Sequence, residues 1–185
     1  AFMGLDLNAR RNLELTETLR NKEKKGSLLW VLDSTKTSMG RRLLKSYIEQ
    51  PLVSPARIIE RLDAVETFCR NSVVLMEISD VLESVYDLER LMTKVMYKTA
   101  NPRDLKSLSA TAKQLPLLKE QLSKLQKSKL LTRYNDDIST LDEISKLVEN
   151  AIVDEPPVSV KDGGVIMNGL NADLDDLRHT MNHGN

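Results

Sequence analysis

The chain is 185 residues long, which suits one domain or one domain with a small appendage, and its 27 basic and 27 acidic side chains give a formal net charge of zero. Cys69 is the only cysteine, which excludes an internal disulfide, and no apolar run approaches the roughly 20 residues of a membrane-spanning helix. Because the N-terminus also lacks the layout of a signal peptide, we expect a soluble cytoplasmic protein without membrane contact.

Basic residues are distributed unevenly along the chain. Residues 1–50 hold 10 Lys and Arg against 6 Asp and Glu, a net charge of +4, whereas the later residues are slightly acidic. A dedicated nucleic-acid-binding domain usually has an overall basic excess, because contacts with phosphates dominate its affinity. The balanced total argues against that class but leaves open a DNA contact through the basic first third.

Helical patterns fill the first part of the chain. Pro51 ends the third of these patterns, and Pro55 stands at the first helical position of the fourth. The candidate N-caps of the four are, in order, Asp6, Ser27, Thr37 or Ser38, and Ser54. The fourth pattern predicts a buried face made of Ile58, Ile59, Leu62, Val65 and Phe68.

The middle of the chain continues in the same way. Residues 72–82 are apolar nearly all round, which predicts a helix buried on more than one side. Another helix is expected over 87–98, and one begins at Asn101, where Pro116 should break or kink it because proline lacks the amide donor. Two more are expected over 129–134 and 138–152.

The pattern changes in DEPPVSVKDGGVIMNG, residues 154–169. Its prolines, glycines and alternating VSV predict an extended segment over about 156–169 with one or two short strands. Residues 2–5 are a possible pairing partner for these strands. A last helix begins after Asn171 without a usual stop signal. The sequence thus predicts a mainly α fold: a multi-helix core domain over 1–170, with a small β patch near the termini, and the start of a long helix over 171–185.

No assembled catalytic, cofactor or metal site can be identified in the sequence. His179 and His183 are four residues apart on the last helix, as some metal ligands are, but solvated histidines are the favoured interpretation. Cys69 is expected to be a buried structural thiol. KDGGVIMNG lacks the spacing of a phosphate loop, and adjacent aspartates point apart on a helix. These features favour a protein without enzymatic activity of its own.

Two pairs of adjacent arginines need partners. Arg10 and Arg11, followed by Asn12, could form a phosphate grip, a catalytic pair or charges that tie parts of a scaffold together. Arg41 and Arg42 lie near a helix N-terminus, where the dipole disfavours cations, so we expect them to pair with carboxylates rather than with DNA phosphates.

Eight blocks of sequence occur in a recognisable order. They are LDLNARRNLEL, SLLWVLDSTKTSMGRRLL, QPL, IIERLDAV, DLERL, ANPRDL, PPVSVKDGGVI and LDDLR. In this order and spacing the chain resembles, over essentially its whole length, the core and lever region of the bacterial DNA mismatch repair family MutS. It departs at Ala9, where the family usually has threonine, and at Leu170, where an aromatic residue is common.

The resemblance implies a mechanical function. It implies a helical core from which lever helices run toward a DNA clamp, with the helix after Asn171 as the beginning of a lever. Such a segment would couple the clamp and the mismatch-binding module to an ATPase. These modules, together with ATP and magnesium, would belong to other parts of a longer protein, and no catalytic, cofactor-binding or metal-binding residue is expected here.

The resemblance also implies partners and a set of structural residues. The partners are mismatched duplex DNA, the other MutS domains, a second copy in a homodimer and a MutL-type repair protein, in the cytoplasm near the nucleoid. The residues in the family blocks with an implied structural or transmitting role are Asp6, Arg10, Arg11, Asn12, Gly40, Arg42, Pro51, Asp162, Gly163, Gly164, Asp175 and Arg178. The alternative is a segment that itself contacts the DNA backbone through its basic N-terminal third.

Overall fold

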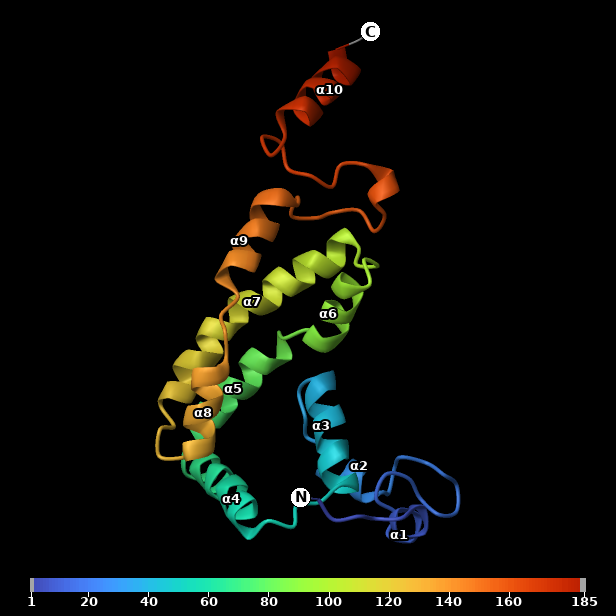
Figure 1. Cartoon of the computed structure of the whole chain (residues 1–185), viewed down its shortest axis with the longest axis vertical. Coiled ribbons are helices and arrows are strands. Elements are labelled where there is room, and N and C mark those ends of the chain that lie inside the picture. The colour runs from blue at the N-terminus through green and yellow to red at the C-terminus, as the bar shows by residue number, and fades with distance from the viewer. Residues whose placement is uncertain (1, 184–185) are drawn as a thin grey trace. The chain divides into compact units, whose positions relative to one another are not determined.

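The computed structural model describes the backbone of residues 2–183 and the side chains of residues 2–181. Nearly all of its regular structure is helical, which confirms the predicted mainly α class (Figure 1). The helices are α1 (Leu7–Asn12), α2 (Leu28–Leu32), α3 (Ser38–Glu49), α4 (Pro55–Arg70), α5 (Ser72–Glu83), α6 (Leu88–Met96), α7 (Pro102–Ser123), α8 (Lys129–Asp137), α9 (Asp142–Ala151), the 3₁₀ helix η1 (Val160–Asp162) and α10 (Ala172–His183).

Side-chain caps explain where several helices begin. The Asp6 carboxylate accepts a hydrogen bond from the Ala9 amide at 2.6 Å, and the Thr37 hydroxyl accepts one from the Gly40 amide at 2.9 Å. At the start of α7, Asn101 and Asp104 each accept the other's backbone amide, at 2.8 and 3.0 Å. These reciprocal bonds satisfy amides that a helix start leaves without partners.

The chain divides into two compact units. The first unit holds the residues up to Asp87 together with Leu117–Ser139, and the second holds Leu88–Pro116 together with the residues from Thr140 onward. The core of the first unit is a cluster from α4, α5 and the α7–α8 region: Ala64, Ile78, Leu122, Leu125, Leu130 and Leu131. The core of the second unit is formed by Val148, Ile152 and Val165 with Leu105, Ala151 and Ile166 packed against them.

The predicted buried face of α4 is largely wrong. Ile58, Ile59, Leu62 and Val65 are 37–59% exposed, and α4 instead turns Ala64 and Phe68 toward the core of the first unit. A small residue lets neighbouring helices approach closely, so Ala64 contacts the core where a larger side chain would hold α4 away. In α5 only Ile78 is buried, so that helix is not buried on several sides either.

The predicted β patch is reduced to isolated bridges within residues 2–183. Phe2 pairs with Leu52, not with the segment 156–169, and Ile152 pairs with Ile166. The second bridge is supported by hydrogen bonds from the Val153 amide to the Val165 carbonyl and from the Met167 amide to the Ala151 carbonyl. Prolines and positive-φ glycines in the segment leave too few consecutive residues for a strand ladder.

Pro116 does not break α7. The helix runs without interruption from Pro102 to Ser123, and the boundary between the two units falls directly after this proline. Leu108, Ala112 and Leu115 before it, and Leu122 after it, are buried. Burial on both sides offsets the cost of the missing amide donor, which explains why the helix continues.

Candidate functional site

The two arginines of SMGRRLL form ion pairs with carboxylates in the first unit. Arg42 Nη1 and Nη2 donate to Asp87 Oδ2 and Oδ1, both at 2.8 Å, and Arg41 Nε lies 2.8 Å from Asp33 Oδ2. The pKa of Asp33 lies below its usual value because the Thr35 hydroxyl and then the Thr35 amide donate hydrogen bonds to its carboxylate, with a smaller contribution from the Arg41 guanidinium. The expected carboxylate partners are confirmed, although both aspartates lie beside helix ends rather than within helices.

Gly40 allows the cap of α3 to close tightly. A Cβ at this position would lie 3.0 Å from Thr37 Oγ1 and 3.6 Å from Thr35 Cβ. Thr37 is the capping side chain, so a larger residue would push it away from the helix end. The glycine of the SMGRR block is thus explained by packing.

The DLNARRN block has fewer contacts than the other arginine block. The Arg10 guanidinium donates to the carbonyl of Leu5 at 3.1 Å, and no residue of α1 is buried. Arg11 and Asn12 are exposed. The segment is tied to α2 by its backbone, through bonds from Leu28 and Leu29 to the carbonyls of Glu14 and Leu15.

The Pro51 carbonyl accepts the Met3 amide at 2.8 Å, beside the Phe2–Leu52 bridge. Gly163 and Gly164 have φ values of +70° and +67°, a left-handed region that other residues enter at a cost. Asp162 ends η1 and is exposed. Pro51, Gly163 and Gly164 therefore contribute through backbone geometry.

The LDDLR block holds the preceding turn against α10 in the second unit. Asp175 accepts the Gly169 amide at 2.7 Å, while Arg178 donates to Asn168 Oδ1 at 2.8 Å and to the Ile166 carbonyl at 3.0 Å. The structure brings together two residues of the predicted set and adds Asn168, which sequence reasoning missed. The only feature of the sequence that could have indicated this contact is that an asparagine closely follows the GVI block.

Replacement of Arg178 by alanine should loosen this turn. Two hydrogen bonds from a charged donor would be lost, so the local opening free energy should fall by about 1–2 kcal/mol. Amide hydrogen exchange at Gly169 is expected to accelerate about tenfold, measured by NMR. Lys161→Ala, in the same segment but exposed, is the matched control. Equal exchange in Arg178→Ala and the parent chain would contradict the assignment.

A second charged cluster in the second unit was not anticipated. Glu149 on α9 accepts from Lys106 Nζ at 3.1 Å and from Ser109 Oγ at 3.0 Å, and it pairs with Lys113 Nζ at 2.8 Å, all on α7. Bonds from Lys113 and then Lys106 lower the pKa of Glu149 to about 2. Its partners lie about 40 residues earlier in the chain, so no local pattern could reveal it.

Other chemical candidates are weaker. Cys69 is exposed, so the expected buried thiol is wrong. Among the described side chains, no group of three His, Cys, Asp or Glu could hold a metal ion, and the side chain of His183 lies outside them. A hollow of about 410 Å³ in the first unit contains Lys24, Arg41, Arg42 and Lys45 with Glu17, but both of its arginines are already paired.

No helix within the described residues has the length and apolar character needed to cross a membrane.

Comparison with known proteins is consistent with this description. The family model described as MutS domain III matches residues 8–181. Proteins named DNA mismatch repair protein MutS from Lachnoclostridium phytofermentans, Acetivibrio thermocellus and Bacillus cytotoxicus are 45%, 48% and 44% identical over 183 residues, 99% of this chain. The chain spans only 20–21% of the length of these relatives. By its sequence and its helical fold, the chain belongs to the MutS domain III family.

Proposed function

We propose that this chain is the core and lever segment of a DNA mismatch repair protein. It couples a DNA clamp and a mismatch-binding module to an ATPase and has no catalytic activity of its own. The observation that carries the proposal is the bidentate Arg42–Asp87 ion pair. It joins α3 to the residue before α6, which lies 45 positions later in the sequence. A fixed joint of this kind keeps packed helices moving together.

Further contacts support a rigid rather than a reactive function. In the first unit, Lys36 before α3 bonds Glu83 at the end of α5 at 2.5 Å. In the second unit, Glu149 and Arg178 each connect a helix to another element. In the proposed longer protein, ATP, magnesium and mismatched DNA are bound by other domains, two copies associate, and a MutL-type partner and a cytoplasmic location follow from the family.

The proposal is tested by breaking the joint in the longer protein. Arg42→Ala, Asp87→Ala and the double variant should each lose several-fold in the stimulation of ATP hydrolysis by mismatched DNA, while basal hydrolysis and DNA affinity stay within twofold. The effects of the two single changes should not add in the double variant, since both remove one interaction. Arg70→Ala is the control, because its partner Glu66 is exposed on the same helix.

The alternative function predicts a different outcome. If the basic first third grips the DNA backbone, Arg42→Ala should weaken DNA binding and reduce its salt dependence, without a specific loss of coupling. Unchanged coupling in all three variants would overturn the proposed transmission through this joint.

A further inference from the structure

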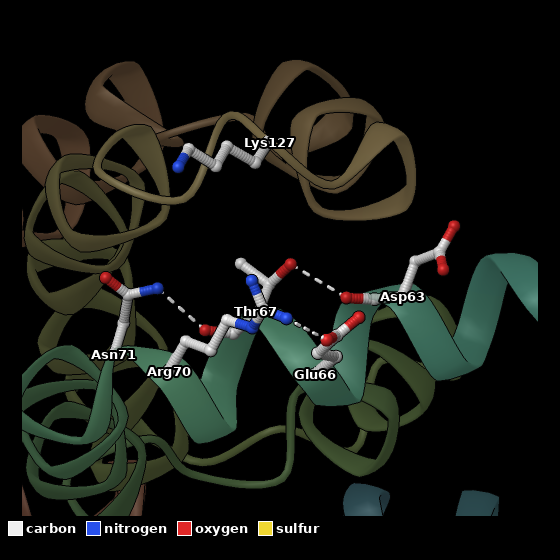
Figure 2. A pocket seen from close by; sticks show the side chains of 6 residues that line it. All are labelled: Asp63, Glu66, Thr67, Arg70, Asn71 and Lys127. Atoms are coloured by element: carbon white, nitrogen blue, oxygen red, sulfur yellow. Dashed lines mark hydrogen bonds and ion pairs between the residues drawn. The ribbon is translucent and has the colours of Figure 1, made fainter.

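A groove follows one side of α4 in the first unit. One hollow of about 360 Å³ is lined by Asp63, Glu66, Thr67, Arg70, Asn71 and Lys127 (Figure 2). A second, of about 440 Å³, is lined by Ala56, Arg57, Ile59, Glu60, Asp63, Lys127 and Lys129. The hollows share Asp63 and Lys127, so together they form one groove between α4 and the α7–α8 connection. We call it the α4 groove.

The groove carries more unpaired positive than negative charge. Arg57, Lys127 and Lys129 are exposed, and their side chains make no ion pair with the other described residues. Two of the three carboxylates are occupied: Glu66 pairs with Arg70, and Glu60 lies 3.1 Å from Arg133. Figure 2 shows Lys127 on the opposite side of the hollow from α4, with its side chain running alongside the helix, and the Asp63 carboxylate turned away from the Glu66–Arg70 pair.

Apolar surface borders these charges. Ile59 lines the groove and is 56% exposed, and Leu62, three residues further along α4, is 59% exposed. A phosphodiester backbone would meet this apolar surface and the Asp63 carboxylate unfavourably. An amphipathic helix suits all parts of this surface. Its apolar side chains can cover the apolar border, its carboxylates can pair with the basic residues, and a basic side chain can pair with Asp63.

We propose that the α4 groove docks an acidic amphipathic helix of a protein partner. Its carboxylates face Arg57, Lys127 and Lys129, its apolar side chains cover Ile59 and Leu62, and one basic side chain faces Asp63. The groove extends from Ala56 to Asn71, about 22 Å along α4. That length accommodates about four turns of a partner helix, and the surface is distinct from the Arg42–Asp87 joint.

The proposal is tested with designed peptides and the isotope-labelled chain. The probe is a 15-residue helix with leucines at every third and fourth position, glutamates beside them and one lysine placed to face Asp63. A lysine-for-glutamate version and a scrambled version of the same composition serve as matched peptides. The glutamate helix should shift the NMR signals of residues 56–71 and 126–130 with a Kd of order 10–100 µM, at least tenfold tighter than either matched peptide.

Charge reversal identifies the contacts. Lys127→Glu with Lys129→Glu should weaken binding of the glutamate helix at least tenfold, whereas Lys25→Glu with Lys146→Glu, the same charge change at exposed sites elsewhere, should alter it less than twofold. Circular dichroism verifies that both double variants remain folded. Equal binding of all peptides, shifts confined to other residues, or insensitivity to the Lys127 and Lys129 reversal would overturn the proposal.

A 15-base-pair DNA duplex tests the competing ligand class. If the duplex shifts the same amides and displaces the glutamate helix at physiological salt, the groove is a nucleic-acid site and the proposed protein partner is wrong. If the duplex leaves these amides unshifted while the helix binds, the protein-docking assignment stands. Neither outcome depends on the ATPase coupling test, so the two proposals fail independently.

Discussion

Replacing Leu125 by alanine should lower the free energy of unfolding by about 3 kcal/mol, within the range of 2–5 kcal/mol typical of buried leucines. Leu125 is only 1% exposed and lies in the cluster that joins α4, α5, α7 and α8 in the first unit. Removal of its side chain leaves a cavity whose walls, formed by Leu122, Leu130 and Leu131, are themselves anchored by helices and can collapse only in part.

The chain provides a convenient probe and control for this measurement. Trp30 is the only tryptophan and belongs to the same unit as Leu125, so its fluorescence during urea unfolding reports on that unit. Leu7→Ala, in the same unit, removes a side chain that is 82% exposed and should cost less than about 0.5 kcal/mol. A loss below 1 kcal/mol in Leu125→Ala would show that the cluster does not stabilise the first unit as described.

Local chemistry in the sequence predicted helix starts better than helix faces. Caps act over three residues, so Asp6, Thr37 and Asn101 could be identified without knowledge of the fold. Periodicity shows that α4 has an apolar side but not whether a neighbour covers it. The cover depends on where α5 and α8 lie, and they contact the Ala64 side instead.

The same distinction applies to the candidate site residues. Arg42 was expected to find a carboxylate because a cation near a helix N-terminus needs one, but its identity as Asp87 depends on tertiary packing. Arg178 bonds Asn168 and Ile166 only because the turn folds back onto α10. The division at residue 170 and the transmitting roles of the family-block residues remain predictions.

The Glu149 carboxylate on α9 should make the folded chain less stable in acid. Its carboxylate takes bonds from Lys106, Ser109 and Lys113, and Lys106 also lies 3.3 Å from Asp154. Lys106 is only 17% exposed, so loss of the carboxylate would leave an ammonium group partly desolvated with one exposed partner. The pKa of Glu149 falls from an ordinary 4.5 to about 2 in the folded chain.

The sign of the pH effect follows from this depressed pKa. The unfolded chain takes up a proton near pH 4.5 and the folded chain only near pH 2, so unfolding is favoured as the pH falls through this window. The stabilisation is fully present above about pH 5. Because the Glu149 side chain is 32% exposed and screened by solvent, we expect about 2 kcal/mol rather than the full value of the shift.

Glu149→Gln isolates this contribution from those of the other carboxylates. The variant should be about 2 kcal/mol less stable than the parent chain at pH 6, and the difference should shrink toward zero at pH 2, where the parent carboxylate is itself half protonated. Urea unfolding followed by circular dichroism between pH 6 and pH 2 measures it. Glu143→Gln, in the first turn of the same helix, should show no such convergence. If the loss of stability in Glu149→Gln does not change with pH, the glutamate acts through packing rather than through its charge. Its ion pairs with Lys106 and Lys113 would then not stabilise the fold.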